Sequence, residues 1–293
     1  MVDLFYLKSF VAVTRTRSFR VAAERNFITQ PAVSQHIRIL EKKLGATLFE
    51  RRGRSVIPTR AGETFLPYAE TILKQYEEAQ TRVRELDNKF GGTIRIATIY
   101  SIGLYELKPA VQEFLKKYPQ VNLHLEYHKS SAIYEMVSNR TVDFGMVAFP
   151  QKRSGVVAQT FAEDELVLAQ SPQQRVIPHK TIALKDLEGV KLIGFAAATA
   201  TGKVIQHFFA GKKIRPDIRH EYDNIELIKS AVVLGLGCAL MPRKTILREL
   251  KDKTLETVNV KGLDVKRPIG VLYPCGKVFT KTTRTFYEML TQP

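Results

Sequence analysis

The stretch SFRVAAERNFITQPAVSQHIRILEKKLG, residues 18–45, decides the fold of the first part of the chain. Ser18 is an N-cap candidate for a short helix, and two alanines in that helix allow a close approach to another helix. Thr29 is the next N-cap candidate, Pro31 lies in the first turn of the helix that follows, and Gly45 ends that helix. Two helices joined by a short turn predict a helix-turn-helix, whose later helix reads a DNA groove.

Both flanks of this stretch extend the prediction. Leu4, Leu7 and Phe10 are spaced as one face of a first helix. Downstream, TLFERRGRSVIPT (47–59) predicts two short strands around Gly53, and a basic hairpin beside a reading helix is a wing that suits phosphates or the minor groove. A plain solvated hairpin is the alternative. Residues 1–60 are therefore expected to form an otherwise all-α winged helix-turn-helix.

Positive charge is densest at the N-terminal end. The 293 residues include 45 Lys+Arg and 29 Asp+Glu, a formal net charge of +16. Residues 1–60 hold 12 basic and 4 acidic residues, a net of +8; residues 61–90 hold 4 and 6, a net of −2; residues 91–293 hold 29 and 19, a net of +10. The basic block indicates a polyanionic partner, most simply nucleic acid, and a solvated basic face is the alternative.

Residues 61–90 carry a heptad pattern. Apolar residues recur at steps of 4, 3, 4, 3, 4, 3 and 4, which predicts a long coiled-coil linker helix that pairs two copies of the chain. A helix that packs on the protein's own core is the alternative, and Pro67 near the helix start is a mild objection to a regular coil. The apolar positions are Phe65, Ala69, Ile72, Tyr76, Ala79, Val83, Leu86 and Phe90.

After Gly91-Gly92, strand patterns and helix patterns alternate along the chain. This alternation predicts an α/β domain over residues 91–293 with a mainly parallel sheet. A second set of strands and helices predicts a second lobe, with a crossover near Phe161 and a return near Lys266. The expected limits are 91–161 with 267–293 for lobe one, and 162–266 for lobe two.

Composition and motifs argue against several classes of protein. The apolar content of 44% argues against disorder, and two cysteines are too few for a disulfide framework or a multi-cysteine zinc site. No apolar run approaches the roughly 18 residues of a membrane helix, and the first residues lack a signal-peptide pattern, so we expect a cytoplasmic protein with no membrane partner. Without a nucleophile elbow, Walker A loop or dinucleotide fingerprint, no enzyme, catalytic residue or metal is expected. A transport solute-binding protein is an alternative for the lobes alone.

Some twenty positions at fixed spacing, together with VDFGMV at 142–147 and GLGCALMP at 235–242, make the whole chain resemble a LysR-type transcriptional regulator. The residues that carry this resemblance in the N-terminal part are Leu7, Phe10, Ser18, Phe19, Ala22, Ala23, Gln30, Pro31, Ala32, Val33, Ser34, Leu40, Glu41, Leu44, Gly45, Leu48, Phe49, Glu50, Arg51, Pro58, Thr59, Ala61 and Gly62.

The resemblance implies a winged helix-turn-helix, a coiled-coil linker helix and a C-terminal two-lobed effector domain like a periplasmic binding protein. It implies a homotetramer built as a dimer of dimers. It also implies that a small co-inducer binds between the lobes and changes how the protein bends double-stranded promoter DNA. No further cofactor is implied, and RNA polymerase is an expected partner of such a regulator.

The DNA contacts are expected on the reading helix and the wing. Gln30, Ser34 and Gln35 are polar side chains able to reach base edges, and glutamine can pair bidentately with adenine. Pro31 is expected to pack on a thymine methyl, and Arg54, nearest the hairpin tip, to enter the minor groove. The expected phosphate partners are His36, Arg38, Ser18 and Thr59. Arg52 and Arg51 complete the wing, and a structural role remains the alternative for Arg51.

The effector is expected at the crevice between the lobes, where strand ends meet helix starts. Ser131 opens a predicted helix, and a hydroxyl beside free helix N–H groups suits an anion such as a carboxylate. A plain N-cap is the alternative for the serines, and a polar turn is the alternative for the threonines. The candidate residues are Tyr100, Ser101, Ile102, Ser130, Ser131, Thr199 and Thr201.

The cysteines are a further point of comparison, because one branch of the family senses peroxide through a cysteine pair. Cys238 lies in an apolar strand pattern and is expected to be buried and inert, and Cys275 follows Pro274 near a strand end. The two do not match a closely spaced redox pair, so redox sensing is not expected.

Overall fold

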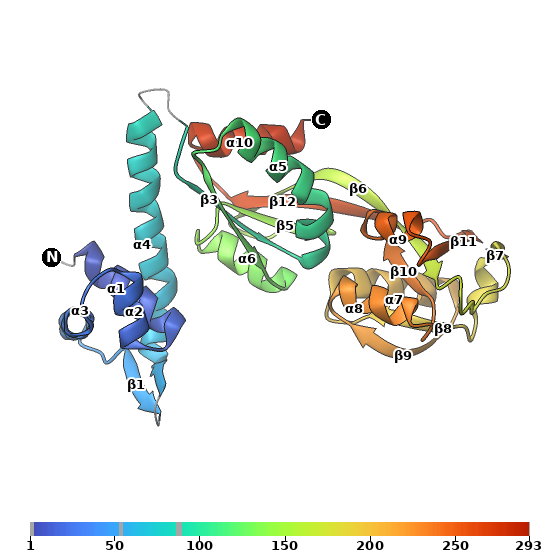
Figure 1. The fold of residues 1–293 in the computed structure, drawn as a ribbon, viewed down its shortest axis with the longest axis horizontal. Coiled ribbons are helices and arrows are strands. Elements are labelled where there is room, and N and C mark those ends of the chain that lie inside the picture. The colour runs from blue at the N-terminus through green and yellow to red at the C-terminus, as the bar shows by residue number, and fades with distance from the viewer. Residues whose placement is uncertain (1–2, 53–54, 86–89, 293) are drawn as a thin grey trace. The chain divides into compact units, whose positions relative to one another are not determined.

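A computed structural model describes residues 3–52, 55–85 and 90–292 (Figure 1). The chain divides into two compact units, Met1–Gly92 with Asn139–Thr141, and Thr93–Ser138 with Val142–Pro293. Each unit has a hydrophobic core of its own.

Side-chain caps begin the helices of the first unit. Asp3, Ser18 and Thr29 each accept a hydrogen bond from a backbone N–H of the first turn, and Gly45 ends the third helix with φ 66°. The helix limits predicted at Ser18, Thr29 and Gly45 are therefore confirmed, as are the two strands of the hairpin. The elements are α1 (Leu4–Thr16), α2 (Phe19–Arg25), α3 (Gln30–Leu44), β1 (Phe49–Arg52), β2 (Ser55–Pro58) and α4 (Arg60–Glu85).

Phe10 lies at the centre of the first unit's core. It is fully buried, and its ring centroid lies 5.4 Å from that of Phe49 and 5.3 Å from that of Phe65. Ala22 and Ala23 of α2 are buried in the same core, as their small size predicted. Each large side chain buried here contributes roughly 1.5–3 kcal/mol. The core therefore holds α3 on a rigid support.

The second unit contains the remaining strands and helices. Those of its first lobe are β3 (Thr93–Thr98), the π-helical turn η1 (Ile102–Glu106), α5 (Leu107–Lys117), β4 (Asn122–Tyr127), α6 (Ser130–Ser138), β5 (Phe144–Ala148) and α10 (Lys281–Thr291). Those of its second lobe are β7 (Thr181–Ala183), η2 (Leu184–Leu187), β8 (Lys191–Phe195), α7 (Ala200–Lys212), β9 (Asp217–Tyr222), α8 (Ile225–Val233), β10 (Ala239–Pro242), η3 (Arg243–Ile246), α9 (Leu247–Lys251) and β11 (Glu256–Lys261).

Two long strands, β6 (Val156–Gln170) and β12 (Lys266–Pro274), run from one lobe to the other (Figure 1). They pair antiparallel with each other, from Lys266 opposite Glu165 to Pro274 opposite Val156. The sheet order is β4-β3-β5-β12-β6-β11-β7, with β10 also paired to β6 and a separate β8-β9 pair.

The prediction of a mainly parallel sheet holds only within the lobes. Strand β3 pairs parallel with β4 and β5, and β8 pairs parallel with β9. The crossover strands run antiparallel to their neighbours β5, β10 and β11, because the chain passes between the lobes and returns. The sheet is therefore mixed.

Candidate nucleic-acid interface and ligand cleft

Helix α3 separates its polar and apolar residues onto two faces. Val33 and Ile37 are buried in the core of the first unit, whereas Gln30, Gln35 and Arg38 are exposed. The 3.6-residue period produces this separation, since the buried positions recur every three to four residues. The core thus fixes which side chains the helix presents to a partner.

The N-terminal turn of α3 brings several predicted base readers together. Thr29 Oγ1 accepts from the Ala32 N–H at 3.3 Å and caps the helix, and Pro31 is exposed in the first turn. Gln30 Nε2 donates to Ser34 Oγ at 3.1 Å, so these two polar groups share a face. The partial positive charge of a helix N-terminus favours a phosphate nearby.

Two predicted phosphate partners have structural bonds within the first unit. Ser18 Oγ accepts from the Val21 N–H at 3.3 Å and caps α2. Thr59 Oγ1 donates to the Thr47 carbonyl at 2.7 Å and accepts from the Gly62 N–H at 3.2 Å. The Thr59 hydroxyl therefore already joins the wing to the start of α4.

His36 is also held by its own unit. Its Nδ1 lies 2.8 Å from Ser9 Oγ, and its ring centroid lies 4.9 Å from that of Tyr6. The ring is therefore oriented by α1, and a phosphate contact would fall to the other ring nitrogen.

The wing is a regular antiparallel hairpin in which Phe49 pairs with Pro58 and Arg52 with Ser55. Arg51 and Arg52 lie in β1, and Arg54 falls outside the described residues. Sequence reasoning missed Glu41 of α3 as the anchor of this hairpin. Its Oε1 accepts from the Leu48 N–H at 2.7 Å. The sequence gives no signal for this contact, because a glutamate within a helix is ordinary.

The apolar seam of α4 divides into two parts. Phe65 and Ala69 pack into the core of the first unit, so the own-core alternative is right for these two positions. Further along, Ile72 is 43% exposed, Tyr76 45% and Val83 67%. Ala79 is exposed as well, whereas Leu86 falls outside the described residues.

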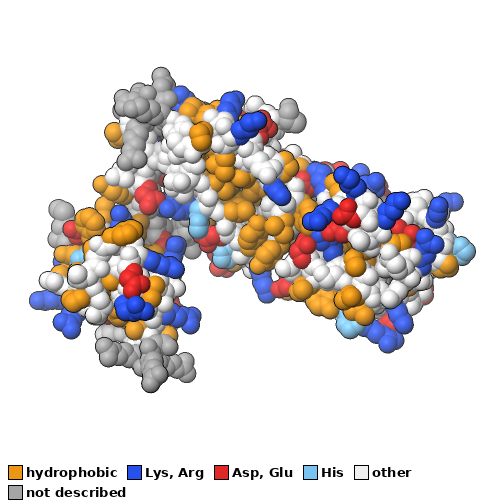
Figure 2. Space-filling view, viewed as in Figure 1, with side chains coloured by type: hydrophobic (Ala, Val, Ile, Leu, Met, Phe, Trp, Pro, Cys, Tyr) orange, Lys and Arg blue, Asp and Glu red, His pale blue; other side chains and the backbone are white. Residues whose placement is uncertain are grey.

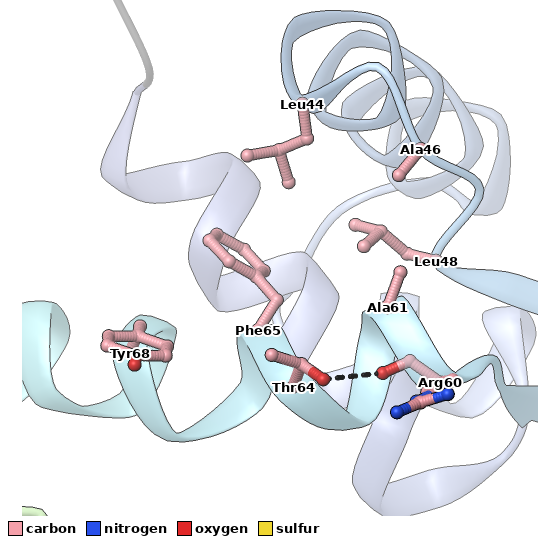
Figure 3. Close-up of a pocket in the computed structure, with 8 residues that line it drawn as sticks. All are labelled: Leu44, Ala46, Leu48, Arg60, Ala61, Thr64, Phe65 and Tyr68. Carbon is pink, nitrogen blue, oxygen red and sulfur yellow. Dashed lines mark hydrogen bonds between the residues drawn. The ribbon is translucent and has the colours of Figure 1, made fainter.

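An apolar groove of about 490 Å³ lies beside the start of α4. Figure 3 shows Leu44, Leu48 and Phe65 around it, and Thr64 Oγ1 donates to the Arg60 carbonyl at 2.8 Å within its wall. The full lining is Leu44, Ala46, Leu48, Arg60, Ala61, Thr64, Phe65 and Tyr68.

In the second unit, the predicted residues after β3 have different environments. Tyr100 is 45% exposed and stacks on Tyr127, the last residue of β4, with ring centroids 4.8 Å apart. Ser101 is buried, and its Oγ accepts from Arg267 Nη2 at 2.7 Å. Ile102 is fully buried in the core, so it presents no side chain to a ligand in this structure.

The predicted helix-start residues also differ. Ser131 is exposed in the first turn of α6, and Ser130 is half-buried. Thr199 Oγ1 accepts from the Gly202 N–H at 3.0 Å and donates to the Ala196 carbonyl at 2.8 Å, so it is the N-cap of α7, a role that was not predicted for it.

The sequence did not predict a set of polar contacts that joins the two lobes. The Tyr105 hydroxyl of η1 donates to Glu226 Oε1 of α8 at 2.6 Å and also bonds Lys229 Nζ. Lys229 is buried and pairs with Glu249 of α9 at 2.8 Å. Burial disfavours the charge of Lys229, but its bonds to Glu249, Tyr105 and Glu226 outweigh burial and raise its pKa.

Two further ion pairs join the lobes. Glu106 Oε2 of η1 lies 2.8 Å from Lys244 Nζ of η3, and the exposed pair of Lys129 and Asp223 lies at 3.5 Å. No local pattern could have indicated them, because each pair joins residues far apart in the chain.

Arg267 on β12 was also missed. It is only 1% exposed, and burial lowers its pKa to about 10 against the opposing charges of Asp164 and Glu106. Its Nε and Nη1 are buried without a hydrogen-bond partner.

The environments of the two cysteines do not match those of a redox pair. Cys238 is buried, and burial raises the pKa of its thiol to about 12, whereas Cys275 is exposed. Within the described residues, no cluster of His, Cys, Asp and Glu is arranged to hold a metal ion. The helices in the described ranges are all too short or too polar to cross a membrane.

Comparison with known proteins identifies the family. The family model described as bacterial regulatory helix-turn-helix protein, lysR family, matches residues 4–63, and the model described as LysR substrate binding domain matches residues 87–292. A probable RuBisCO transcriptional regulator of Cyanophora paradoxa is 32% identical over 292 residues, covering 98% of this chain and 90% of that protein.

Two solved structures share the fold. Full-length CbnR, determined in complex with its target DNA, superposes with a TM-score of 0.76 at 23% identity and covers 98% of each chain. The regulatory domain of Synechocystis PCC6803 CcmR in complex with 2-PG superposes with a TM-score of 0.62 at 22% identity, covering 68% of this chain and 95% of that one. The chain therefore belongs to the LysR family: it is a ligand-responsive, DNA-binding transcriptional regulator and not an enzyme.

Proposed function

We propose that this regulator reads promoter DNA with the exposed face of α3 and the β1–β2 wing, as a dimer joined through α4, under control of a small anion bound between the lobes. The observation that carries the proposal is the exposed polar face of α3. This helix belongs to the DNA-reading head, residues 1–60, whose net charge is +8. Figure 2 shows Lys and Arg side chains along the edges of the first unit on the face in view.

The roles on DNA follow from the chemistry of each side chain. Gln30 and Gln35 read base edges, because amides pair bidentately with adenine in the major groove. Ser34 bonds either base type, and Pro31 packs on a thymine methyl. Arg38 lies further along the exposed face and contacts phosphate. Arg51, Arg52 and Arg54 of the wing are assigned to the phosphates or the minor groove. Residues 1–60 are thus the proposed DNA-binding part, and residues 61–90 are the linker helix.

The exposed part of the α4 seam supports dimerisation. Ile72, Tyr76 and Val83 leave an apolar stripe in water, which a second copy of the helix would cover. The groove beside the start of α4 continues this apolar surface at Leu44 and Tyr68. Two paired heads place two reading helices on successive major-groove half-sites, and a dimer of dimers is the assembly we propose.

The effector site is proposed in the crevice between lobe one (91–161 and 267–293) and lobe two (162–266). Tyr100 and Ser131 are exposed at strand and helix ends of lobe one, where crevices of α/β sheets bind ligands. The CcmR regulatory domain, which shares this fold, was solved with 2-PG. Effector binding would change promoter bending and the contact with RNA polymerase, in the cytoplasm where the promoter lies.

The test is fluorescence anisotropy of the full-length protein on DNA from upstream of its own gene and on a shuffled fragment of equal composition. At fixed physiological salt, specific sites are typically bound about 10³-fold or more tightly than other DNA. We expect a preference of that order for the upstream DNA and a steep loss of affinity with salt. Equal affinity for both fragments would contradict the proposal.

A further inference from the structure

We propose that Arg267, on the crossover strand β12, holds the negatively charged head group of the effector, with the Ser101 hydroxyl as its second donor. The ligand class is a small carboxylate or phosphate anion. This assignment rests on the proposed effector role of the inter-lobe crevice, and it places the charge-bearing contact on the strand that joins the lobes.

The guanidinium of Arg267 lacks partners for most of its donors. Its Nη2 donates to Ser101 Oγ at 2.7 Å, whereas its Nε and Nη1 are buried and unpaired. Buried charges in proteins are ordinarily paired and hydrogen-bonded, because water no longer solvates them. An anionic oxygen is the group that would satisfy these donors, and arginine binds carboxylate and phosphate more specifically than other residues do.

Ser101 is placed to act with Arg267. It follows β3 and precedes the π-helical turn η1, yet its side chain makes no capping bond to that turn. Its Oγ accepts from Arg267, which leaves the hydroxyl hydrogen free to donate. The serine and the arginine therefore offer donors to one oxygen-bearing group at the end of β3.

The nearest carboxylates, Asp164 and Glu106, act on Arg267 through charge and form no hydrogen bond with it. Asp164 accepts from the N–H groups of Glu165 at 2.8 Å and Lys244 at 3.2 Å, and Glu106 Oε2 pairs with Lys244 Nζ at 2.8 Å. Two carboxylates beside two cations leave the cluster near neutral, so anion binding rests on the unpaired donors of Arg267 and on the Ser101 hydroxyl rather than on a net positive charge.

Access to Arg267 requires the lobes to move. Arg267 pairs with Asp164 where β12 and β6 cross between the lobes, and the bonds from Glu106 to Lys244 and from Tyr105 to α8 close this region. Lobes joined by two strands are a hinge arrangement. An anion held at Arg267 would therefore bind in the hinge itself, so occupancy and lobe geometry become coupled.

The experiment is a thermal-shift and calorimetric titration of the full-length protein with inorganic phosphate and with 2-PG, against chloride at equal ionic strength. Arg267→Met removes the charge while keeping an unbranched side chain, and Arg267→Lys keeps the charge but loses the planar fork. Arg175→Met, which removes an exposed arginine paired with Glu256, is the matched control.

We expect phosphate or 2-PG to raise the melting temperature of the wild type and of Arg175→Met. Arg267→Met is expected to bind about ten- to hundredfold more weakly, the range for a hydrogen bond to a charged group, with an anion-free melting temperature no lower than the wild type. Ser101→Ala should weaken binding less. If Arg267→Met fails to fold, an unchanged anion affinity in Arg267→Lys overturns the assignment of the planar fork.

Wild-type affinity in Arg267→Met, or no anion binding by the wild type, overturns the proposal. Specific DNA binding without effector is measured on the same samples. Its absence in the wild type would mean failure of the proposed function, whereas its presence in an Arg267→Met protein that no longer responds to anions supports both.

Discussion

The exposed face of α3 and the buried hinge around Arg267 present polar groups in opposite ways. Gln35 and Arg38 lie in water on a helix whose other face is core, so they lose little free energy while unpaired. Arg267 is 1% exposed with two unpaired nitrogens, so the folded state bears the cost of its desolvation. A surface that meets a large polyanion can remain hydrated, whereas a site for a small ligand must exclude water to bind it strongly.

The largest effect is expected from Ile72→Asp, which tests whether the head acts only as a pair. A carboxylate on the seam would be buried without a partner in both copies, at a cost of several kcal/mol, so we expect the dimer dissociation constant to rise at least about hundredfold. Light scattering measures the loss of the dimer, and a gel-shift assay measures the loss of DNA binding that should follow from it. Gln80→Asp, exposed and off the seam, is the control. A dimeric Ile72→Asp protein would mean that another surface joins the copies.

Arg267→Met tests the cost assigned to the hinge. Lowering the pKa of Arg267 from its usual range to about 10 corresponds to on the order of 3 kcal/mol of destabilisation by the protonated group. We expect Arg267→Met to be more stable than the wild type at pH 7 in urea unfolding, by somewhat less than this amount because the Ser101 bond is lost.

The pH dependence follows from the same shift. The unfolded chain holds the Arg267 proton more tightly than the folded one, so wild-type stability gains relative to Arg267→Met as pH rises above about 10. A lower stability of Arg267→Met at pH 7 would show that the guanidinium is a structural group whose charge is already compensated.

Gln35→Ala tests base reading on the hydrated surface. We expect a loss of about 1–3 kcal/mol in discrimination at one base pair, with little change for sites already altered there. Arg38→Ala, on the same helix, should weaken all sites alike and reduce the salt slope by about 1. Competition between site variants measures both, and an equal loss on every variant for Gln35→Ala would remove it from the base readers.

The smallest effect separates a cap from a ligand contact. Thr199→Ala removes the N-cap of α7 and should cost about 1 kcal/mol of stability without changing anion affinity. Ser131→Ala, at an exposed hydroxyl, should leave stability nearly unchanged and lower anion affinity. Urea unfolding and calorimetry distinguish the two, and the reverse pattern would exchange their roles.

Most of the first unit was predictable because its signals are local. The caps at Ser18 and Thr29 and the end at Gly45 lie within a few residues of the bonds that they make. The heptad pattern of α4 predicted the helix, but it could not show where the apolar seam leaves the core of the first unit and becomes exposed. Phe65 and Ile72 are both large apolar residues at seam positions, so the sequence does not distinguish them. Only the fold shows that the first is in the core.

The hinge could not be predicted because its contacts join distant residues. Ser101 accepts a hydrogen bond from Arg267, which lies 166 residues later in the sequence, and Tyr105 donates to Glu226 of α8, which lies 121 residues later. In the sequence, RPIGVLY (267–273) is an ordinary strand pattern that begins with a basic residue, and nothing there indicates that this residue is buried. The antiparallel crossover, which puts Arg267 beside Asp164, was likewise hidden in a pattern that predicted parallel strands.

The most direct test of the account measures Gln35→Ala and Arg267→Met side by side for operator selectivity and for the phosphate-induced rise in melting temperature. We expect each variant to lose one property and keep the other. Gln35→Ala loses operator selectivity and keeps the phosphate response. Arg267→Met loses the phosphate response and keeps operator selectivity, which is measured without effector. Loss of the phosphate response in Gln35→Ala, or its retention in Arg267→Met, would contradict the assignment of DNA reading to α3 and of effector binding to the hinge.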